Sequence, residues 1–230
     1  MSFLFALVTD HWALVASDTR ARWKEYDADD PRDLATLPAT RVIDGGSKLV
    51  PLVDGWLASG PHETWRTGLR DAVSEAHGLA ALTAAVRAFG PPAMARLEQE
   101  SSAEARDVRQ RQSTMLVVRH QGGFAGAALD WAGSPLWPGA DCRTVSALCP
   151  DVPVETMRGR LHAYQTAVQH ERDLRHVVRA TAQLFRDVSA ETGPEGSVSA
   201  EVALGLLNAQ GRRLIGPCPH AELLGEEVPC

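Results

Sequence analysis

The sequence is short of cysteine, and the few it has are poorly placed for cross-linking. Its four cysteines, spread over 230 residues, form no C-x-x-C pair. This pattern does not indicate a disulfide scaffold, and we expect free thiols. Cys218, His220 and Cys230 are the alternative, as metal ligands near the C-terminus. We expect an irregular tail over residues 216–230 instead, and neither a metal nor an organic cofactor.

Lysine is also scarce, since only Lys24 and Lys48 are lysines among the 23 basic residues. Arginine keeps its charge at any ordinary pH, whereas the pKa of a lysine ammonium can be tuned by its surroundings. A lysine kept in this background is therefore a candidate for a role that arginine cannot fill. Lys24 lies in a polar run and is interpreted as an ordinary surface residue. Lys48 stands at the head of an apolar strand, which makes it the candidate.

Two further absences limit the partners. The net charge is -6 and no Lys/Arg-rich run is present, which argues against a general nucleic-acid binder. The apolar opening at residues 1–8 follows no basic residue, and Asp10 and His11 interrupt it before it resembles a signal peptide. No run reaches the roughly 18 to 20 apolar residues that a membrane span requires. We expect a cytoplasmic protein with neither nucleic acid nor membrane as a partner.

The first third of the chain predicts two hairpins followed by helices. Apolar runs at 2–9 and 12–18 form one hairpin, and runs at 48–53 and 56–59 form another that turns at Asp54-Gly55. Helical spacing of apolar residues then covers 65–89 and is predicted to end at Pro91-Pro92. Residues 93–111 are highly charged and predict an exposed helix or a helical extension. Residues 23–45 lack a period and predict an irregular excursion.

The remaining elements complete the predicted fold. A third hairpin is expected over 115–119 and 123–129, a short strand over 144–148, two helices within 153–191, and closing strands over 197–207 and 213–215. Grouped strands and grouped helices predict an α+β fold, with antiparallel sheets covered by helices. The composition, with 44% hydrophobic residues, suits a single domain over residues 1–230.

Two segments resemble a known family. Residues 5–21, FALVTDHWALVASDTRA, resemble the opening hairpin of proteasome β-subunits, and residues 47–60, SKLVPLVDGWLASG, are similar to that family's second hairpin. The motifs match over residues 2–60, and beyond them the resemblance lies in the order of elements. Within this family, the sequence resembles most the bacterial ancestral β-subunits and betaproteobacterial proteasome homologues. The resemblance implies the N-terminal-nucleophile (Ntn) hydrolase fold, a four-layer αββα sandwich of two antiparallel sheets flanked by helices.

The resemblance also implies roles for individual residues. The first residue of the mature chain is the family's nucleophile, which corresponds to Ser2 once Met1 has been removed. Its α-amino group, with a pKa near about 7.7 to 8.0, would accept the hydroxyl proton. Lys48, held by Asp18 on the adjacent strand, would stabilise the alkoxide. Gly60 would donate its backbone N–H to the oxyanion.

Other residues have supporting roles in this scheme. Arg20 is expected to be a structural or substrate-orienting charge. Asp187 corresponds to the aspartate that supports the amino terminus in the family, although Ser189 lacks the glycine that usually follows it. The partner serine is therefore one of Ser189, Ser197 and Ser199. Taken singly, each of the expected site residues also has an ordinary structural interpretation, and the hypothesis depends on their combination.

The sequence thus predicts an N-terminal serine hydrolase that cleaves amide bonds, in particular peptide bonds. The resemblance implies assembly with copies of itself into a ring or related oligomer, and an unfoldase ATPase as an optional partner. Two alternatives remain open. One is a catalytically inactive assembly subunit with the same fold, and the other is an amidase that acts on a small molecule.

Overall fold

The first sheet is formed by both ends of the chain. The computed structural model describes all residues except 1–2, 61, 137–145, 149–151, 194–195 and 217–230. The five-stranded sheet has the order β11-β10-β2-β1-β9, with antiparallel neighbours throughout. Its strands are β1 (Leu4–Val8), β2 (Trp12–Asp18), β9 (Ser146–Leu148), β10 (Val202–Asn208) and β11 (Gly211–Ile215). The predicted first hairpin is present as β1 and β2.

The second sheet is a simple meander of two hairpins. It has four antiparallel strands in chain order: β5 (Leu49–Leu52), β6 (Gly55–Ser59), β7 (Ser113–His120) and β8 (Gly123–Asp130). The β5–β6 turn falls at Asp54, as the Asp-Gly signal predicted. The β7–β8 turn uses Gln121 and Gly122, both with positive φ.

The strands are apolar on both faces because both faces of each sheet are covered. In β1, Leu4, Ala6 and Val8 face the second sheet and pack in a cluster with Trp56 and Met115. The alternate residues of β1, Phe5 and Leu7, lie in a different cluster that includes α4 (Val154–Val168) and α5 (Leu174–Thr192). One strand therefore contributes to two cores, which explains why its sequence does not alternate between apolar and polar residues.

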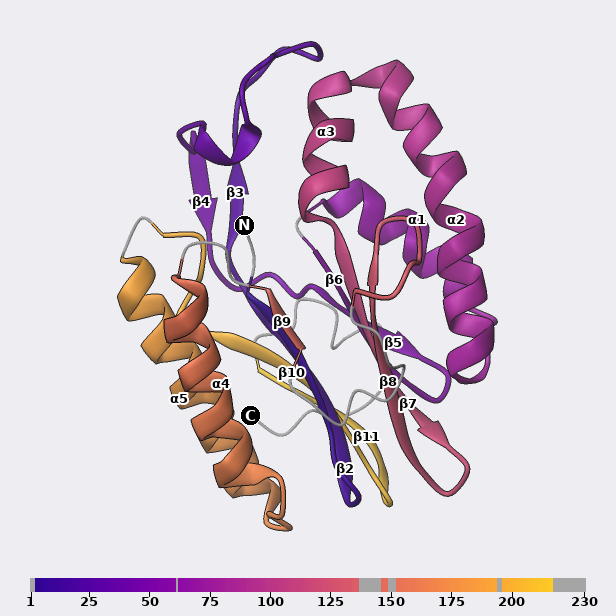
Figure 1. Ribbon diagram of the computed structural model, residues 1–230, viewed down its shortest axis with the longest axis vertical. Helices are drawn as coiled ribbons and strands as arrows, with labels where there is room; N and C mark the ends of the chain where they lie inside the picture. Colours follow the sequence, from indigo (N-terminus) through magenta and orange to yellow (C-terminus); the bar gives the residue numbers. More distant parts are fainter. Residues whose placement is uncertain (1–2, 61, 137–145, 149–151, 194–195, 217–230) are drawn as a thin grey trace.

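Three helices lie on the side of the second sheet away from the first. They are α1 (Glu63–Val73), α2 (Gly78–Glu100) and α3 (Ser102–Arg111). Helices α1 and α2 pack on the sheet, and α3 packs on α2. Leu69 of α1 and Val86 of α2 pack on Leu57 and Leu116 of the sheet. Figure 1 shows the resulting order of layers, with α4 and α5 on one side, the two sheets in the middle and α1–α3 on the other. The prediction of an α+β fold with antiparallel sheets covered by helices is confirmed.

Two local predictions were wrong. The helix expected to end at Pro91-Pro92 continues to Glu100, with both prolines inside it. The helix packs here against the turn that follows β8. Arg87 Nε donates to the carbonyl of Gly133, and Gly90 lies so close to Trp131 that a Cβ on Gly90 would collide with the Trp131 carbonyl. Tertiary contact here outweighs the local preference of proline.

The excursion at 23–45 also contains regular structure. β3 (Ala21–Trp23) pairs with β4 (Arg41–Ile43), and a 3₁₀ helix, η1 (Leu34–Thr36), lies between them. Because this ribbon is short and mostly exposed, its sequence carries no alternation that a pattern search would detect.

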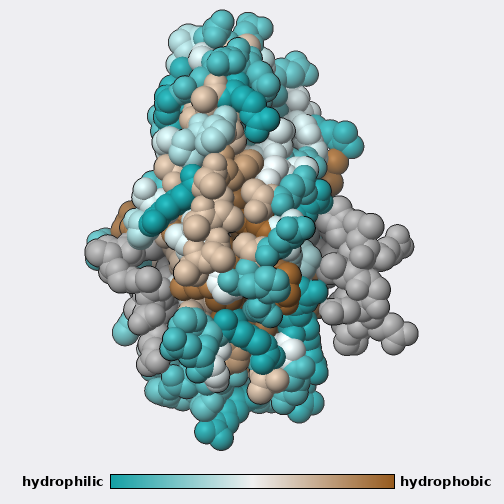
Figure 2. All heavy atoms as spheres, turned by 90° about the vertical axis from the view of Figure 1, so that its right-hand side faces the viewer, coloured by the Kyte–Doolittle hydropathy of each residue, from teal (hydrophilic) through white to brown (hydrophobic). Residues whose placement is uncertain are grey.

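The outer surface of α2 is unusually poor in charge. This helix exposes small apolar side chains, among them Ala81, Ala84, Ala88 and Ala95. Figure 2 shows a weakly to strongly hydrophobic band along this side of the molecule, between hydrophilic surfaces. A search of the described helices finds none that combines the length and the apolar character needed to cross a membrane.

Candidate functional site

Asp18 is the centre of a buried polar cluster at the end of β2. Its side chain is fully buried, and its Oδ1 accepts a hydrogen bond from the backbone N–H of Phe3 at 2.8 Å. Its Oδ2 accepts from Lys48 Nζ at 2.6 Å and from the N–H of Arg20 at 3.1 Å. The Asp18 N–H in turn donates to the carbonyl of Phe3 at 3.0 Å. A carboxylate with this many donors is held in one orientation.

Lys48 reaches Asp18 from the other sheet. It directly precedes β5, and its side chain is only 7% exposed. The expected contact between the two residues is present, but it bridges two facing sheets and not adjacent strands of one sheet. Burial lowers the pKa of Lys48, Asp18 opposes that effect, and the charge of Arg66 adds to it. The amine is therefore easier to deprotonate than an exposed lysine, which is the property that arginine lacks.

The predicted nucleophile lies outside the described residues, as do Met1, all four cysteines and His220. Phe3, the residue bonded to Ser2, is described. It is fully buried, its ring packs on Phe185 of α5, and both its backbone polar groups are bonded to Asp18. The start of the described chain is thus fixed directly beside the Asp18–Lys48 pair.

Gly60 is close to the second sheet, but its amide is already engaged. The N–H of Gly60 donates to the carbonyl of Ser113 at 2.9 Å, which continues the ladder between β6 and β7. A Cβ at this position would lie 3.3 Å from the N of Ser113, so the backbone is tightly enclosed. An oxyanion role would require this hydrogen bond to be exchanged for one to the substrate.

Asp187 is not brought to this cluster by its contacts. It lies on α5, where its Oδ1 accepts from Gln183 at 2.7 Å and its Oδ2 lies 3.6 Å from Arg160 of α4. With 40% of the side chain exposed, it belongs to a surface network of the helix pair. The predicted support of the amino terminus by Asp187 is not seen in these contacts.

Of the three serines left open by the sequence, Ser199 contacts the cluster. Its Oγ accepts from the N–H of Thr19 at 3.0 Å and lies 2.9 Å from Thr19 Oγ1. Ser189 instead donates to the carbonyl of Val198. Ser197 is buried. Thr19, the residue after Asp18, is therefore held in place by Ser199 in the segment before β10.

Arg20 has a structural role in the folded chain. Its Nε and Nη2 donate to the two carboxylate oxygens of Asp44 at 2.8 and 2.9 Å, and Nη1 donates to the carbonyl of Gly196. These bonds tie the start of the β3–β4 ribbon to its end and to the segment before β10. The hydrogen bond and charge of Asp44 raise the pKa of Arg20.

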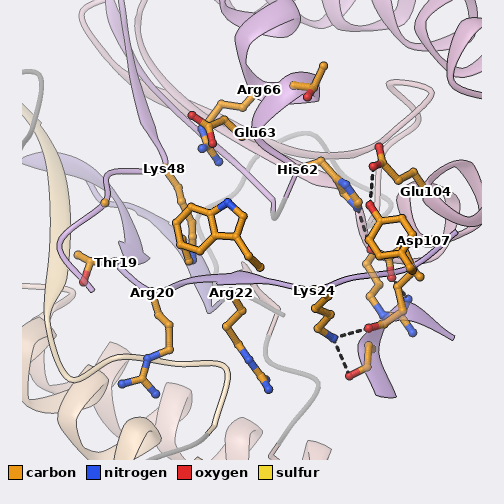
Figure 3. A pocket seen from close by; sticks show the side chains of 18 of the residues that line it. Thr19, Arg20, Arg22, Lys24, Lys48, His62, Glu63, Arg66, Glu104 and Asp107 are labelled. Atoms are coloured by element: carbon orange, nitrogen blue, oxygen red, sulfur yellow. Dashed lines mark hydrogen bonds and ion pairs between the residues drawn. The ribbon is translucent and has the colours of Figure 1, made fainter. Parts of the chain in front are cut away.

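A cavity of about 300 Å³ opens beside Lys48. Segment 19–26 forms one wall, and α1 and α3 supply the opposite one (Figure 3). Both lysines of the chain line this cavity. Lys24 was interpreted as an ordinary surface residue, but its Nζ donates to the carbonyls of Leu34 and Ala35, and burial lowers its pKa.

Sequence reasoning missed a charged network at the opposite end of the cavity. His62 Nε2 lies 2.7 Å from Asp107 Oδ2, and Asp107 also binds Arg111, which binds Asp33 at 2.6 Å. Burial raises the pKa of Asp107, but the bonds to His62 and Arg111 outweigh it, and the pKa is below its ordinary value. One usable signal was the spacing of Asp107 and Arg111, four positions apart, which places both side chains on one face of a helix.

Among the described residues, no group of three or more His, Cys, Asp or Glu side chains is arranged to hold a metal ion. Searches against protein-family models and against curated proteins found no match to this chain. The function must therefore be argued from the cluster and the cavity themselves.

Proposed function

We propose that this protein is an N-terminal-nucleophile hydrolase that cleaves amide bonds, with Ser2 as nucleophile after removal of Met1. The observation that carries the proposal is the buried carboxylate of Asp18, which holds Lys48 Nζ at 2.6 Å and the backbone N–H of Phe3 at 2.8 Å. This arrangement supports a site in which Ser2, bonded to Phe3, lies beside the Lys48 amine. The cavity that Lys48 lines would then receive the substrate.

The chemistry follows from the properties of the groups. A serine hydroxyl is a weak nucleophile and requires a base within hydrogen-bond reach. In the proposed reaction the free α-amino group of Ser2 accepts the hydroxyl proton as the oxygen attacks the amide carbonyl. The amine then passes the proton to the leaving nitrogen, and water hydrolyses the acyl-enzyme. Lys48 stabilises the negative charge that develops on the hydroxyl oxygen, and Asp18 holds Lys48 in place.

The two facing sheets with helices on both outer sides support the assignment to the Ntn-hydrolase fold. Assembly into a ring or related oligomer is part of the same proposal and rests on the resemblance of residues 2–60. Mass photometry of the purified chain tests it, because a particle of one chain would contradict assembly. The weakly charged surface of α2 is the first face to examine if the particle is larger.

One observation favours a second candidate, an inactive subunit with the same fold. The N–H of Gly60 donates to Ser113 and is not available for an oxyanion in this arrangement. Removal of one oxyanion donor has cost about 10²- to 10³-fold in turnover elsewhere. A chain in which this bond persists would keep the fold and lose most of its chemistry.

Intact-mass analysis with a β-lactone electrophile separates the two candidates. For the hydrolase, the purified protein lacks Met1 and gains one lactone adduct on residue 2. Ser2→Ala abolishes the adduct, while Ser2→Thr, which preserves a hydroxyl at the same place, retains it. A protein that keeps Met1, or an adduct that survives Ser2→Ala, contradicts the proposal. A library of peptides and small amides then distinguishes a peptidase from a small-molecule amidase.

A further inference from the structure

The cavity beside Lys48 carries more positive than negative charge, although the whole chain has a net charge of -6. Its lining includes six basic residues, Arg20, Arg22, Lys24, Lys48, Arg66 and Arg111. It includes three acidic residues, Glu63, Glu104 and Asp107. A concave surface of this kind attracts anions, because a cleft lined by one sign of charge concentrates its field.

Most of these charges are already satisfied within the protein. Lys48 pairs with Asp18, Arg20 with Asp44, and Arg111 with Asp107 and Asp33. Glu104 accepts a hydrogen bond from the hydroxyl of Tyr26. These groups therefore hold the walls of the cavity together, and they offer little to a ligand.

Arg22 and Arg66 are different. Among the described residues, Arg22 Nε and Arg66 Nη1 are buried nitrogens without a hydrogen-bond partner, and no ion pair joins either side chain to a carboxylate. Leaving a buried charged donor unpaired is unfavourable unless another group completes it. A ligand that enters the cavity is the natural candidate for that group.

The positions of Arg22 and Arg66 show which of the two would contact a ligand bound beside Lys48. Arg20, Arg22 and Lys24 occupy alternate positions of an extended segment, and Figure 3 shows all three side chains on the side away from Lys48 and Arg66. Arg66 lies on the same side of the cavity as Lys48, and its charge acts on the Lys48 amine. A substrate held for attack beside Lys48 thus meets Arg66 first.

We propose that Arg66 binds a carboxylate of the substrate and makes the site selective for acidic amides. A planar guanidinium binds a carboxylate through two parallel hydrogen bonds, which gives both strength and orientation. Burial lowers the pKa of Arg66 and the charge of Glu63, one turn earlier on α1, opposes this, but Glu63 is exposed and the buried Nη1 has no hydrogen-bond partner. The cavity of about 300 Å³ has room for an acidic side chain of the substrate. This inference rests on the proposed function and names its substrate class.

Turnover of matched substrates provides the first test. Two fluorogenic peptides are compared that differ only in Glu or Gln before the leaving group. The wild-type protein is expected to prefer Glu by about 10- to 100-fold in kcat/KM, the ratio that a hydrogen-bonded charge pair supplies. Arg66→Gln should bring the ratio close to one, mainly through KM, and Arg66→Lys should restore part of it. Arg22→Gln is the matched control and should leave the ratio unchanged.

Binding without turnover provides an independent test. The Ser2→Ala protein is titrated by calorimetry with N-acetyl-glutamate α-amide, N-acetyl-glutamine and N-acetyl-glutamine amide. The first carries a side-chain carboxylate, the second a terminal carboxylate and the third none. Tighter binding of the first or second supports carboxylate recognition and identifies its source, provided that Arg66→Gln weakens it at least about 10-fold.

The two proposals fail in different ways. Hydrolysis at Ser2 with equal kcat/KM for Glu and Gln substrates would overturn the carboxylate site and leave the hydrolase intact. Arg66-dependent binding of an acid by a protein that never forms an acyl-enzyme would overturn the hydrolase and leave the carboxylate site intact. Loss of the Glu preference in Arg22→Gln, but not in Arg66→Gln, would also overturn the assignment.

Discussion

Both ends of the cavity contain buried or partly buried basic side chains, but these have partners in the protein at one end and lack a partner in part at the other. At the Asp107 end, defined by His62, Asp107 and Arg111, each of these polar side chains has a described partner in the protein. At the Lys48 end, defined by Lys48 and Arg66, a buried amine depends on a single carboxylate, and a buried guanidinium nitrogen lacks a partner. A satisfied network stabilises the fold, whereas an incomplete one is prepared for a ligand.

The contrast has a physical origin in the layers. The Asp107 end joins the start of α1, α3 and the excursion, where charges on helix surfaces meet the segment around η1. The Lys48 end lies where the last residue of β2 meets the residue before β5, and there the side chains of Asp18 and Lys48 are buried between the two sheets. Low polarity makes each missing partner at that end more costly and each tuned pKa more extreme.

The largest expected effect is that of Lys48→Gln. We expect kcat/KM for the preferred amide to fall by about 10²- to 10³-fold, the range that loss of one group stabilising a developing charge costs. The free energy of unfolding should also fall by roughly 3 to 5 kcal/mol, because Asp18 is left as a buried charge without its partner. Fluorogenic assays and urea denaturation measure the two quantities.

A double variant separates chemistry from folding in that experiment. Asp18→Asn combined with Lys48→Gln removes both charges, so most of the lost stability should return while activity stays low. Recovery of activity together with stability would mean that Lys48 supports the fold alone, and the two ends of the cavity would then be alike.

Asp107→Asn tests the other end, with an intermediate effect on stability and little on turnover. We expect about 1 to 3 kcal/mol of stability to be lost at pH 7, since bonds to His62 and Arg111 become neutral and weaker. The pKa of Asp107 is below its unfolded value of 3.8, so this contribution is fully present above that value. It is lost as the pH falls through the lower folded pKa.

Urea denaturation of both proteins at pH 7 and near pH 3 checks this sign. The difference between wild type and variant should shrink at the lower pH, while kcat/KM at pH 7 changes by less than about threefold. A loss of turnover as large as that of Lys48→Gln would place His62 and Asp107 in the chemistry and would remove the proposed contrast.

Much of the fold followed from local patterns. Apolar runs with an Asp-Gly turn predicted β5 and β6, and helical spacing predicted α4 and α5, because these elements are determined by neighbours in the sequence. The contact between Lys48 and Asp18 came from matching two hairpins to a family. It could not come from periodicity, because the residues lie in different sheets.

The residues that were missed depend on contacts between distant segments. Asp107 meets His62 across 45 positions, and Arg111 meets Asp33 across 78. Nothing in the sequence around either pair signals its partner. Asp187 likewise lies 3.6 Å from Arg160 of the neighbouring helix, a contact that its own segment does not signal, while its expected support of the amino terminus stays a prediction. The sequence shows which residues carry charge, but the packing of the helices determines which residues they pair with.

The smallest effect should come from Lys24→Gln, the same substitution as at position 48 but in the other lysine of the cavity. Lys24 Nζ donates to two neutral carbonyls, of Leu34 and Ala35, so its removal leaves no opposite charge uncompensated. Both hydrogen bonds are only partly buried, and a glutamine amide also carries N–H donors for these carbonyls. We therefore expect a loss of about 1 kcal/mol or less in the free energy of unfolding, and kcat/KM within about twofold of wild type. Urea denaturation and the fluorogenic assay, run beside Lys48→Gln, measure both. Equal effects at the two positions would show that burial of a lysine, and not its pairing with Asp18, determines the behaviour of this cavity.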